Sequence, residues 1–193
     1  MSVADSPDRA SATGTAITWT APAVEAPVVK PAKPYTAPLE LRHRAQIEAL
    51  LHATGFFREP EIAIALEVLD SFFAAPDRDY SALGAFTPGG RLIGYVCFGP
   101  TPCTMGTWDL YWIAVAPDAQ NAGVGTTLLQ EVERRLADAD ARLVIIETSS
   151  QPFYEPTRSF YGRRGYAEVA RVPDFYADGD DRVIFAKRIQ QER

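Results

Sequence analysis

The hydrophobic residues of this 193-residue chain follow a helical period first and a strand period afterwards. Apolar residues recur every three or four positions over residues 42–54, and Gly55 then ends this predicted helix. A second helix begins at Pro60, where Glu61 suits the positive N-terminal end, and its apolar face includes Phe72. The folded part of the chain is therefore expected to open with two amphipathic helices.

Alternating and fully apolar runs follow, and they predict strands. Residues 82–87 and 91–98 are joined by a Pro-Gly-Gly turn, which is typical of a hairpin. Residues 107–116 are mostly apolar on both faces, so they predict a central strand covered on both sides. The remaining predicted elements are helix 126–137, strand 142–149, helix 156–164, strand 166–171 and strand 181–188. This order predicts an α/β fold with a mixed sheet.

Residues 1–38 differ in composition from the rest, because they hold six of the 15 prolines. Proline removes a backbone donor and favours extended backbone, so this segment is predicted to be a flexible arm ahead of one domain at 39–193. An arm that docks on a partner is the alternative. No secretory signal and no apolar run long enough for a membrane span is apparent, which favours a cytoplasmic protein.

Acidic residues outnumber basic residues by 25 to 19, which gives a formal net charge of −6. This charge makes nucleic acid an unlikely partner and suits a cationic or amine-bearing substrate. The chain has only two cysteines, Cys97 and Cys103, and its two histidines lie in a predicted helix. These residues are too few for a disulfide framework or the usual zinc site, so we expect no metal.

The sequence Gln-Asn-Ala-Gly-Val-Gly at 120–125 lies between a predicted strand and a predicted helix. Glycines allow close backbone approach, and the free N–H groups of a helix N-terminus attract phosphate. A P-loop would need a lysine after Gly125, and the dinucleotide fingerprint would need a third glycine where Leu128 stands. The loop is therefore predicted to bind phosphate in another way.

Two linked motifs carry a family resemblance. The loop at 120–125 resembles the [QR]-x-x-G-x-[GA] acyl-CoA loop of the GNAT superfamily of N-acetyltransferases, and Phe160-Tyr161-Gly162-Arg163-Arg164-Gly165-Tyr166 resembles its F-Y-x-x-x-G-[FY] helix end. The resemblance covers roughly residues 40–190. It implies a mixed, largely antiparallel central sheet flanked by helices.

The resemblance also implies acetyl-CoA as the co-substrate. The backbone of Ile113, Ala114 and Val115 would bind the pantetheine arm in the manner of an added strand. The loop would hold the pyrophosphate through the amides of Gln120, Asn121, Ala122, Gly123, Val124, Gly125 and Thr126. Glutamine in place of arginine at 120 removes one ion pair that relatives can form.

Acyl transfer to an amine needs a group that removes a proton and a group that protonates the leaving thiolate. Asp109 is the first candidate for the base, because it corresponds to a glutamate that some GNAT relatives use. Glu147 is the second candidate, and each acid has a structural pairing role as its alternative. The resemblance assigns the acid to Tyr161, whose alternative is a core aromatic. Tyr154 stands where relatives often have asparagine.

Aromatic residues concentrate in three predicted loops, the first of which commonly borders the acceptor pocket in GNAT relatives. They are Phe56, Phe57, Phe153, Tyr154, Phe175 and Tyr176. Together with nearby aspartates they suit a small amine held over a ring, although packing between helices would also explain the first pair.

The sequence therefore predicts an N-acetyltransferase that transfers acetyl from acetyl-CoA to a primary amine of a small molecule or peptide. A non-catalytic acyl-CoA sensor or interaction module is the alternative, motivated by the shorter acid at Asp109 and the missing asparagine. Relatives often form dimers, so a homodimer is left open.

Overall fold

The structure is a computed structural model that describes residues 33–189. One seven-stranded sheet in the order β1-β2-β3-β4-β5-β7-β6 organises this part of the chain. All neighbouring strands are antiparallel except β4 and β5. The strands are β1 (Tyr35–Pro38), β2 (Ser81–Phe86), β3 (Leu92–Pro100), β4 (Thr107–Val115), β5 (Leu143–Ser149), β6 (Ala167–Ala177) and β7 (Asp180–Arg188). The predicted mixed and largely antiparallel sheet is confirmed.

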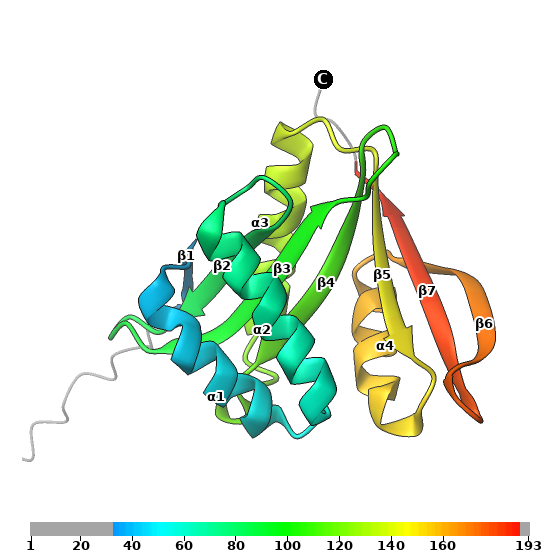
Figure 1. Cartoon of the computed structure of the whole chain (residues 1–193), viewed down its shortest axis with the longest axis horizontal. Coiled ribbons are helices and arrows are strands. Elements are labelled where there is room, and N and C mark those ends of the chain that lie inside the picture. The colour runs from blue at the N-terminus through cyan, green and yellow to red at the C-terminus, as the bar shows by residue number, and fades with distance from the viewer. Residues whose placement is uncertain (1–32, 190–193) are drawn as a thin grey trace, which may run out of the picture. The chain divides into compact units, whose positions relative to one another are not determined.

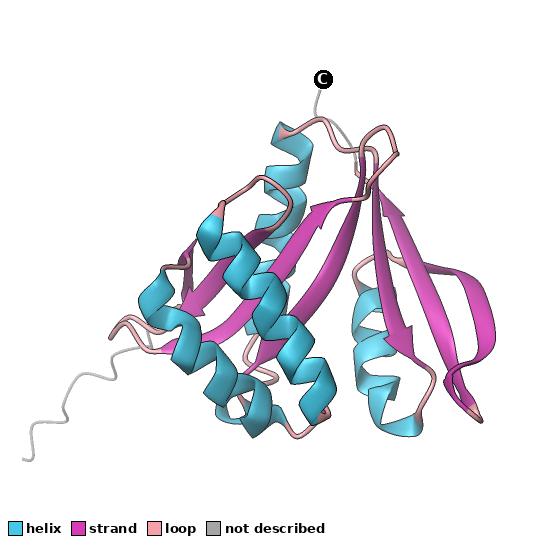
Figure 2. Ribbon diagram, in the orientation of Figure 1, coloured by secondary structure: helices cyan, strands magenta, loops and turns pink. Residues whose placement is uncertain are grey.

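Helices cover both faces of this sheet. They are α1 (Arg44–Thr54), α2 (Glu59–Ala74), α3 (Val124–Asp138) and α4 (Glu155–Arg163), with short 3-10 turns η1 (Leu41–His43), η2 (Pro117–Ala119) and η3 (Pro152–Tyr154). In Figure 1, α1 and α2 lie in front of β2 to β4, and α3 lies behind them. Figure 2 shows α4 beside β5 and β7, apart from the α1–α2 layer.

Each helical layer has its own hydrophobic core. On one face, α1 and α2 bury residues such as Ile47, Leu51 and Leu69 against alternate side chains of β2 and β3. On the other face, Leu128 and Val132 of α3 join the opposite side chains of the same strands. The strands β2 and β3 are thus covered twice, which explains their nearly continuous burial.

Local chemistry fixes the ends of the first two helices. Gly55 follows α1 at φ 67°, the left-handed conformation that glycine adopts without strain. At the start of α2, the carboxylate of Glu61 accepts the main-chain N–H of Arg58 at 2.8 Å. Pro60 lies in the first turn of α2, where a missing N–H costs nothing.

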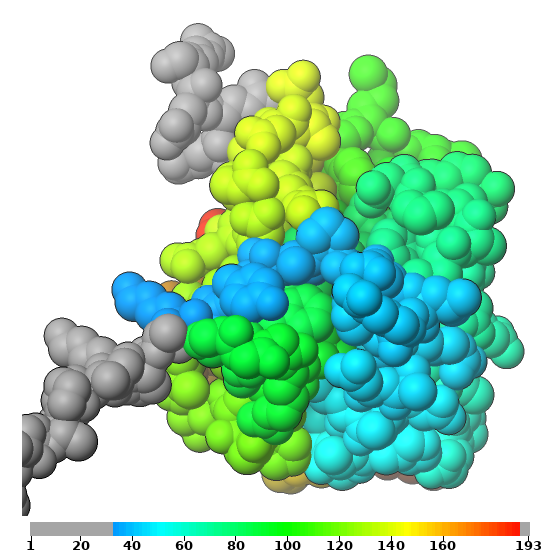
Figure 3. Space-filling view, turned by 90° about the vertical axis from the view of Figure 1, so that its left-hand side faces the viewer, coloured from blue at the N-terminus to red at the C-terminus, as the bar shows by residue number. Residues whose placement is uncertain are grey.

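The structure corrects two predicted boundaries. β1 lies inside the range assigned to the arm and pairs with β2, so the sheet begins at Tyr35, and Figure 3 shows this strand at the surface between α3 and α1. The rest of the predicted arm, residues 1–32, lies outside the described residues. β6 extends to Ala177, beyond the predicted end at 171, because pairing with β7 resumes after a register shift between Val172 and Ala177. Within residues 33–189, no helix is long and apolar enough to cross a bilayer.

The buried face of α3 gives a stability prediction. Leu128 is fully buried, so Leu128→Ala should leave a cavity and lower the free energy of unfolding by about 2–5 kcal/mol. Gln130 is exposed on the same helix, and Gln130→Ala should change stability by no more than about 0.5 kcal/mol. Urea denaturation of both variants measures the difference, and equal losses would contradict the described packing of α3.

Candidate active site

A cleft of about 870 Å³ opens where β4 and β5 part. The two strands are paired from Thr107 with Leu143 to Leu110 with Ile146, and the register ends there. Both strands continue past this point, β4 to Val115 and β5 to Ser149. In Figure 1 they diverge like the arms of a V. The cleft therefore borders a stretch of β4 that has a neighbour on its β3 side alone.

The free edge of β4 presents main-chain groups to the cleft. Ala116 donates its N–H to Ile93 on the β3 side at 2.9 Å, and alternate residues of a strand direct these groups to opposite edges. Ile113 and Val115 therefore direct their N–H and C=O groups toward the gap. The side chain of Gln120 donates to the carbonyl of Val115 at 3.2 Å, which holds the following loop against the end of the strand.

The loop after β4 leads directly into α3. Gly123 takes φ 85° at the N-cap of the helix, and Asn121 also has a positive φ of 60°. The carbonyl of Gly123 accepts the N–H of Thr127 at 3.0 Å, which closes the first helical turn. Among the described residues, no hydrogen bond occupies the N–H groups of 121–126. All of these residues except Ala122 line the cleft, and their free donors and the positive end of the helix suit an anion.

Arg164, at the end of α4, adds a positive charge beside this loop. Its guanidinium donates a hydrogen bond to the hydroxyl of Thr126 and lies 5.4 Å from the ring centre of Phe160. Its Nε atom is buried without a partner, and no carboxylate of the described chain pairs with it. Sequence reasoning missed this residue, although the adjacent arginines inside the F-Y-x-x-x-G motif were a visible signal. Gln120 stands where some relatives have arginine and carries no charge. Arg164 places a positive charge beside the same loop from the end of α4.

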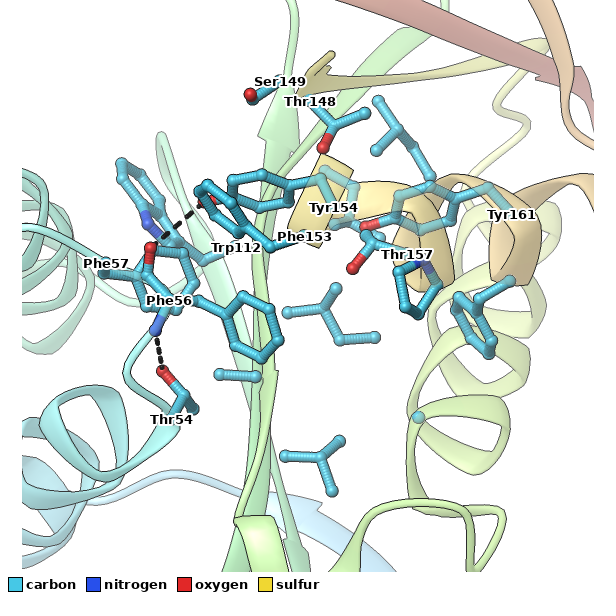
Figure 4. A pocket seen from close by; sticks show the side chains of 18 of the residues that line it. Thr54, Phe56, Phe57, Trp112, Thr148, Ser149, Phe153, Tyr154, Thr157 and Tyr161 are labelled. Atoms are coloured by element: carbon cyan, nitrogen blue, oxygen red, sulfur yellow. Dashed lines mark hydrogen bonds between the residues drawn. The ribbon is translucent and has the colours of Figure 1, made fainter. Parts of the chain in front are cut away.

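Tyr161 reaches into the cleft from α4, as Figure 4 shows. Its ring is 3% exposed and packs on Tyr166 and Phe185, with ring centres 6.0 and 5.8 Å away. Burial raises the pKa of its phenol above the ordinary value of 10.0, so the hydroxyl stays protonated at neutral pH. Thr157, one turn earlier on α4, also lines the cleft.

Asp109, the first candidate for the base, lies outside the cleft lining. Asp109 lies in the paired part of β4, before the strands separate, and is not among the residues that line the cleft. Its carboxylate accepts a hydrogen bond from the hydroxyl of Thr101 at 2.7 Å. The correspondence with GNAT relatives identified a position on the strand. Which positions face the cleft, however, depends on where β4 and β5 stop pairing.

Glu147 is better placed than Asp109. It is the first residue of β5 beyond the last β4–β5 pair, and it lines the cleft. Arg182 of β7 forms an ion pair with it. Phe175 lies outside the cleft lining and is 50% exposed, but its ring centre is 4.8 Å from the Arg182 guanidinium. Phe175 therefore contacts the partner of Glu147 rather than the cleft itself.

The other aromatic residues gather at the end of the cleft farthest from the α3 loop, and Trp112 joins them (Figure 4). Tyr154 donates its hydroxyl to the carbonyl of Phe56 at 3.4 Å, and the rings of Phe56 and Phe153 have centres 6.2 Å apart. The predicted residues Phe57 and Tyr176 also line this end. Burial, together with Glu61 and Asp180, raises the pKa of Tyr154 to about 12.

The structure thus brings most predicted site residues into one cleft. The predicted residues that line it are Phe56, Phe57, Ile113, Ala114, Val115, Gln120, Asn121, Gly123, Val124, Gly125, Thr126, Glu147, Phe153, Tyr154, Tyr161 and Tyr176. Asp109, Ala122 and Phe175 do not line it. No cluster of three or more metal-ligating side chains occurs within residues 33–189.

Known proteins share this architecture. A structure of an acetyltransferase assigned to the GNAT family from Desulfovibrio desulfuricans is 36% identical, with a TM-score of 0.78 over 82% of this chain and 100% of that one. The ribosomal-protein-S18-alanine N-acetyltransferase of Escherichia coli is 16% identical, with a TM-score of 0.67 over 83% of this chain and 97% of its own. An aminoglycoside 6'-N-acetyltransferase complexed with coenzyme A is 17% identical, with a TM-score of 0.66 over 82% and 99% of the two chains. The last two likenesses show the fold alone.

Sequence comparison gives the same family. An uncharacterised N-acetyltransferase of Methanocaldococcus jannaschii is 27% identical over 100 residues, which are 51% of this chain. The match spans 61% of the length of that curated relative. The model of the acetyltransferase (GNAT) family matches residues 45–166, more than half of the sequence. The chain therefore belongs to the GNAT family of acetyltransferases.

Proposed function

We propose that this protein transfers an acetyl group from acetyl-CoA to a primary amine by direct attack in a ternary complex. The observation that carries the proposal is the separation of β4 from β5 in front of the unoccupied N–H groups that open α3. One cleft joins this phosphate-binding geometry to a buried tyrosine and a carboxylate. Family membership and the likeness to a CoA complex support acyl-CoA as the donor.

The two ends of the cleft have different charges, which assigns the donor and acceptor to opposite ends. Arg163 and Arg164 line the end near the α3 loop. The lining also holds three carboxylates, those of Glu61, Glu147 and Asp180, and one further arginine, Arg58, which pairs with Glu61. The diphosphate of CoA suits the first end, and its pantetheine arm would extend the sheet along Ile113–Val115. An amine would approach from the second end.

Two residues at the point of separation provide the proton transfers. An alkylammonium has a pKa above 10, so it must lose a proton before its nitrogen can attack the thioester carbon. Glu147 accepts this proton, directly or through water, and the new C–N bond forms as the carbonyl becomes tetrahedral. Collapse breaks the C–S bond, and Tyr161 donates its phenolic proton to the leaving thiolate. Tyr161 then recovers a proton from the nitrogen of the new amide by way of solvent.

Removing either proton-transfer group should slow turnover more than it weakens donor binding. Glu147→Gln and Tyr161→Phe should each lower kcat about 10²–10⁴-fold, while the Kd for CoA by calorimetry changes little. Glu67→Gln and Tyr35→Phe alter exposed residues outside the cleft and serve as matched controls. No binding of CoA to the parent protein at millimolar concentration would refute the proposal. Binding without turnover of any amine in a broad screen would instead favour an acyl-CoA sensor.

The raised pKa of Tyr161 predicts the shape of the pH profile. Because burial favours the neutral phenol, the acid remains protonated as pH rises through its ordinary value of 10.0. The kcat/KM for an alkylamine should therefore rise with pH as more amine becomes neutral, and it should not decline below about pH 10. Stopped-flow measurement of thiol release over this range checks the prediction. A descending limb near pH 8 would assign the acid to another group.

Arg164 gives a separate test of the donor end. Arg164→Gln should raise the Kd for CoA at least about tenfold, because a charge-assisted contact to phosphate is lost. Arg134→Gln removes an arginine from the exposed side of α3, where it pairs with Glu131, and should leave the Kd unchanged. Calorimetry at two salt concentrations measures both, with thermal melting as a check of folding. Equal affinities for parent and Arg164→Gln protein would exclude this residue from phosphate binding.

A further inference from the structure

The three carboxylates at the aromatic end of the cleft differ in their partners. Glu61 pairs with Arg58 at 3.1 Å, and Glu147 pairs with Arg182. Asp180 forms no ion pair within the described chain, and its two hydrogen bonds come from neutral donors. Arg58 lies within electrostatic range of Asp180 but forms its ion pair with Glu61, so no cation of the described residues contacts the Asp180 carboxylate.

The hydrogen bonds of Asp180 also leave one of its oxygens free. The hydroxyl of Ser149 donates to Oδ1 at 2.5 Å, and the N–H of Ser150 donates to the same atom at 3.2 Å. No donor of residues 33–189 reaches Oδ2. Two serines thus fix the orientation of the carboxylate while its second oxygen can accept a ligand. A half-buried carboxylate held in this way is matched to an ammonium group.

Two tyrosines lie within electrostatic range of the Asp180 carboxylate. Asp180 contributes, after burial, to the raised pKa of both Tyr154 and Tyr176, which shows that the two phenols lie within its field. Both tyrosines line the cleft, and so does Phe153. A cation at Oδ2 would lie beside ring faces that attract positive charge.

The spacing along β5 separates this position from the reaction centre. Glu147 and Ser149 are two residues apart, so they point to the same face of the strand and lie about 7 Å apart. Asp180 is bonded to Ser149, whereas Glu147 lies at the point where β4 and β5 part. Asp180 is therefore a second carboxylate beside the one at the reaction centre, and a cation bound to it would be a different group from the attacking amine.

A hydrogen bond also connects the two walls of the cleft at its aromatic end. The hydrogen bond from Tyr154 to Phe56 joins the β5–α4 loop to the α1–α2 loop across the cleft. This contact leaves less room for a polypeptide laid across the site than for a short, slender molecule.

From these observations we infer that the acceptor is a small diamine, with one amine near Glu147 and a second, protonated amine held by Asp180. The inference rests on the proposed acetyl transfer and specifies its substrate class. Alkyl diamines are the simplest molecules of this class. The distal ammonium stays charged, while Glu147 removes the proton from the proximal amine before attack.

The test compares a diamine with the monoamine of equal length, 1,5-diaminopentane against 1-aminopentane, using parent protein, Asp180→Asn and Asp181→Asn. Asparagine keeps an oxygen for the serine donors and removes only the charge. Asp181 is the neighbouring acid, which pairs with Arg171 and does not line the cleft, so it is the matched control. Both kcat/KM with acetyl-CoA and the Kd of each amine for the CoA-bound protein are measured.

The parent protein and Asp181→Asn should prefer the diamine at least about tenfold in both measurements, and Asp180→Asn should lose this preference without a change in the CoA Kd. Equal use of diamine and monoamine by the parent protein, or an unchanged preference in Asp180→Asn, would overturn the inference and leave acetyl transfer intact. Failure of the parent protein to bind CoA would refute the proposed function itself.

Discussion

The end of backbone pairing between β4 and β5 is the constraint on which the site depends. Four residue pairs hold the strands together, and beyond Leu110 and Ile146 each strand must find other partners for its polar groups. On β4 those groups face a cleft, where water or a ligand can satisfy them. An unpaired strand edge is usually a liability in a soluble protein, but here it is enclosed and matches a donor with alternating amide groups.

The parting of the strands persists because helices pack on each half of the sheet, and one hydrophobic core spans both halves. The half from β1 to β4 is clamped between α1–α2 and α3, with a hydrophobic core on each face. The half from β5 to β7 is held by antiparallel pairing and by α4, whose Tyr161 packs against Phe185. Neither half needs the strands to pair along their whole length. The cleft is thus a consequence of packing on both sides of it.

Much of this arrangement could be predicted from local sequence. Gly55 and Pro60 marked helix boundaries, and the glycines at 123 and 125 marked the phosphate-binding turn. The position of Asp109 outside the cleft lining could not be predicted, because the residues that face a cleft depend on where two distant strands stop pairing, which local periodicity does not encode. Arg164 and Asp180 were undervalued for a related reason. Both residues stand out because neither forms an ion pair within the described chain. Whether a charged residue is paired depends on the folded structure and cannot be predicted from local sequence.

The contact between Tyr154 and Phe56 has a kinetic consequence. It ties together two loops that belong to opposite walls of the cleft, and the high pKa of Tyr154 keeps its donor proton in place even in alkaline solution. An acceptor that binds behind these rings would have to pass between two loops that this hydrogen bond joins.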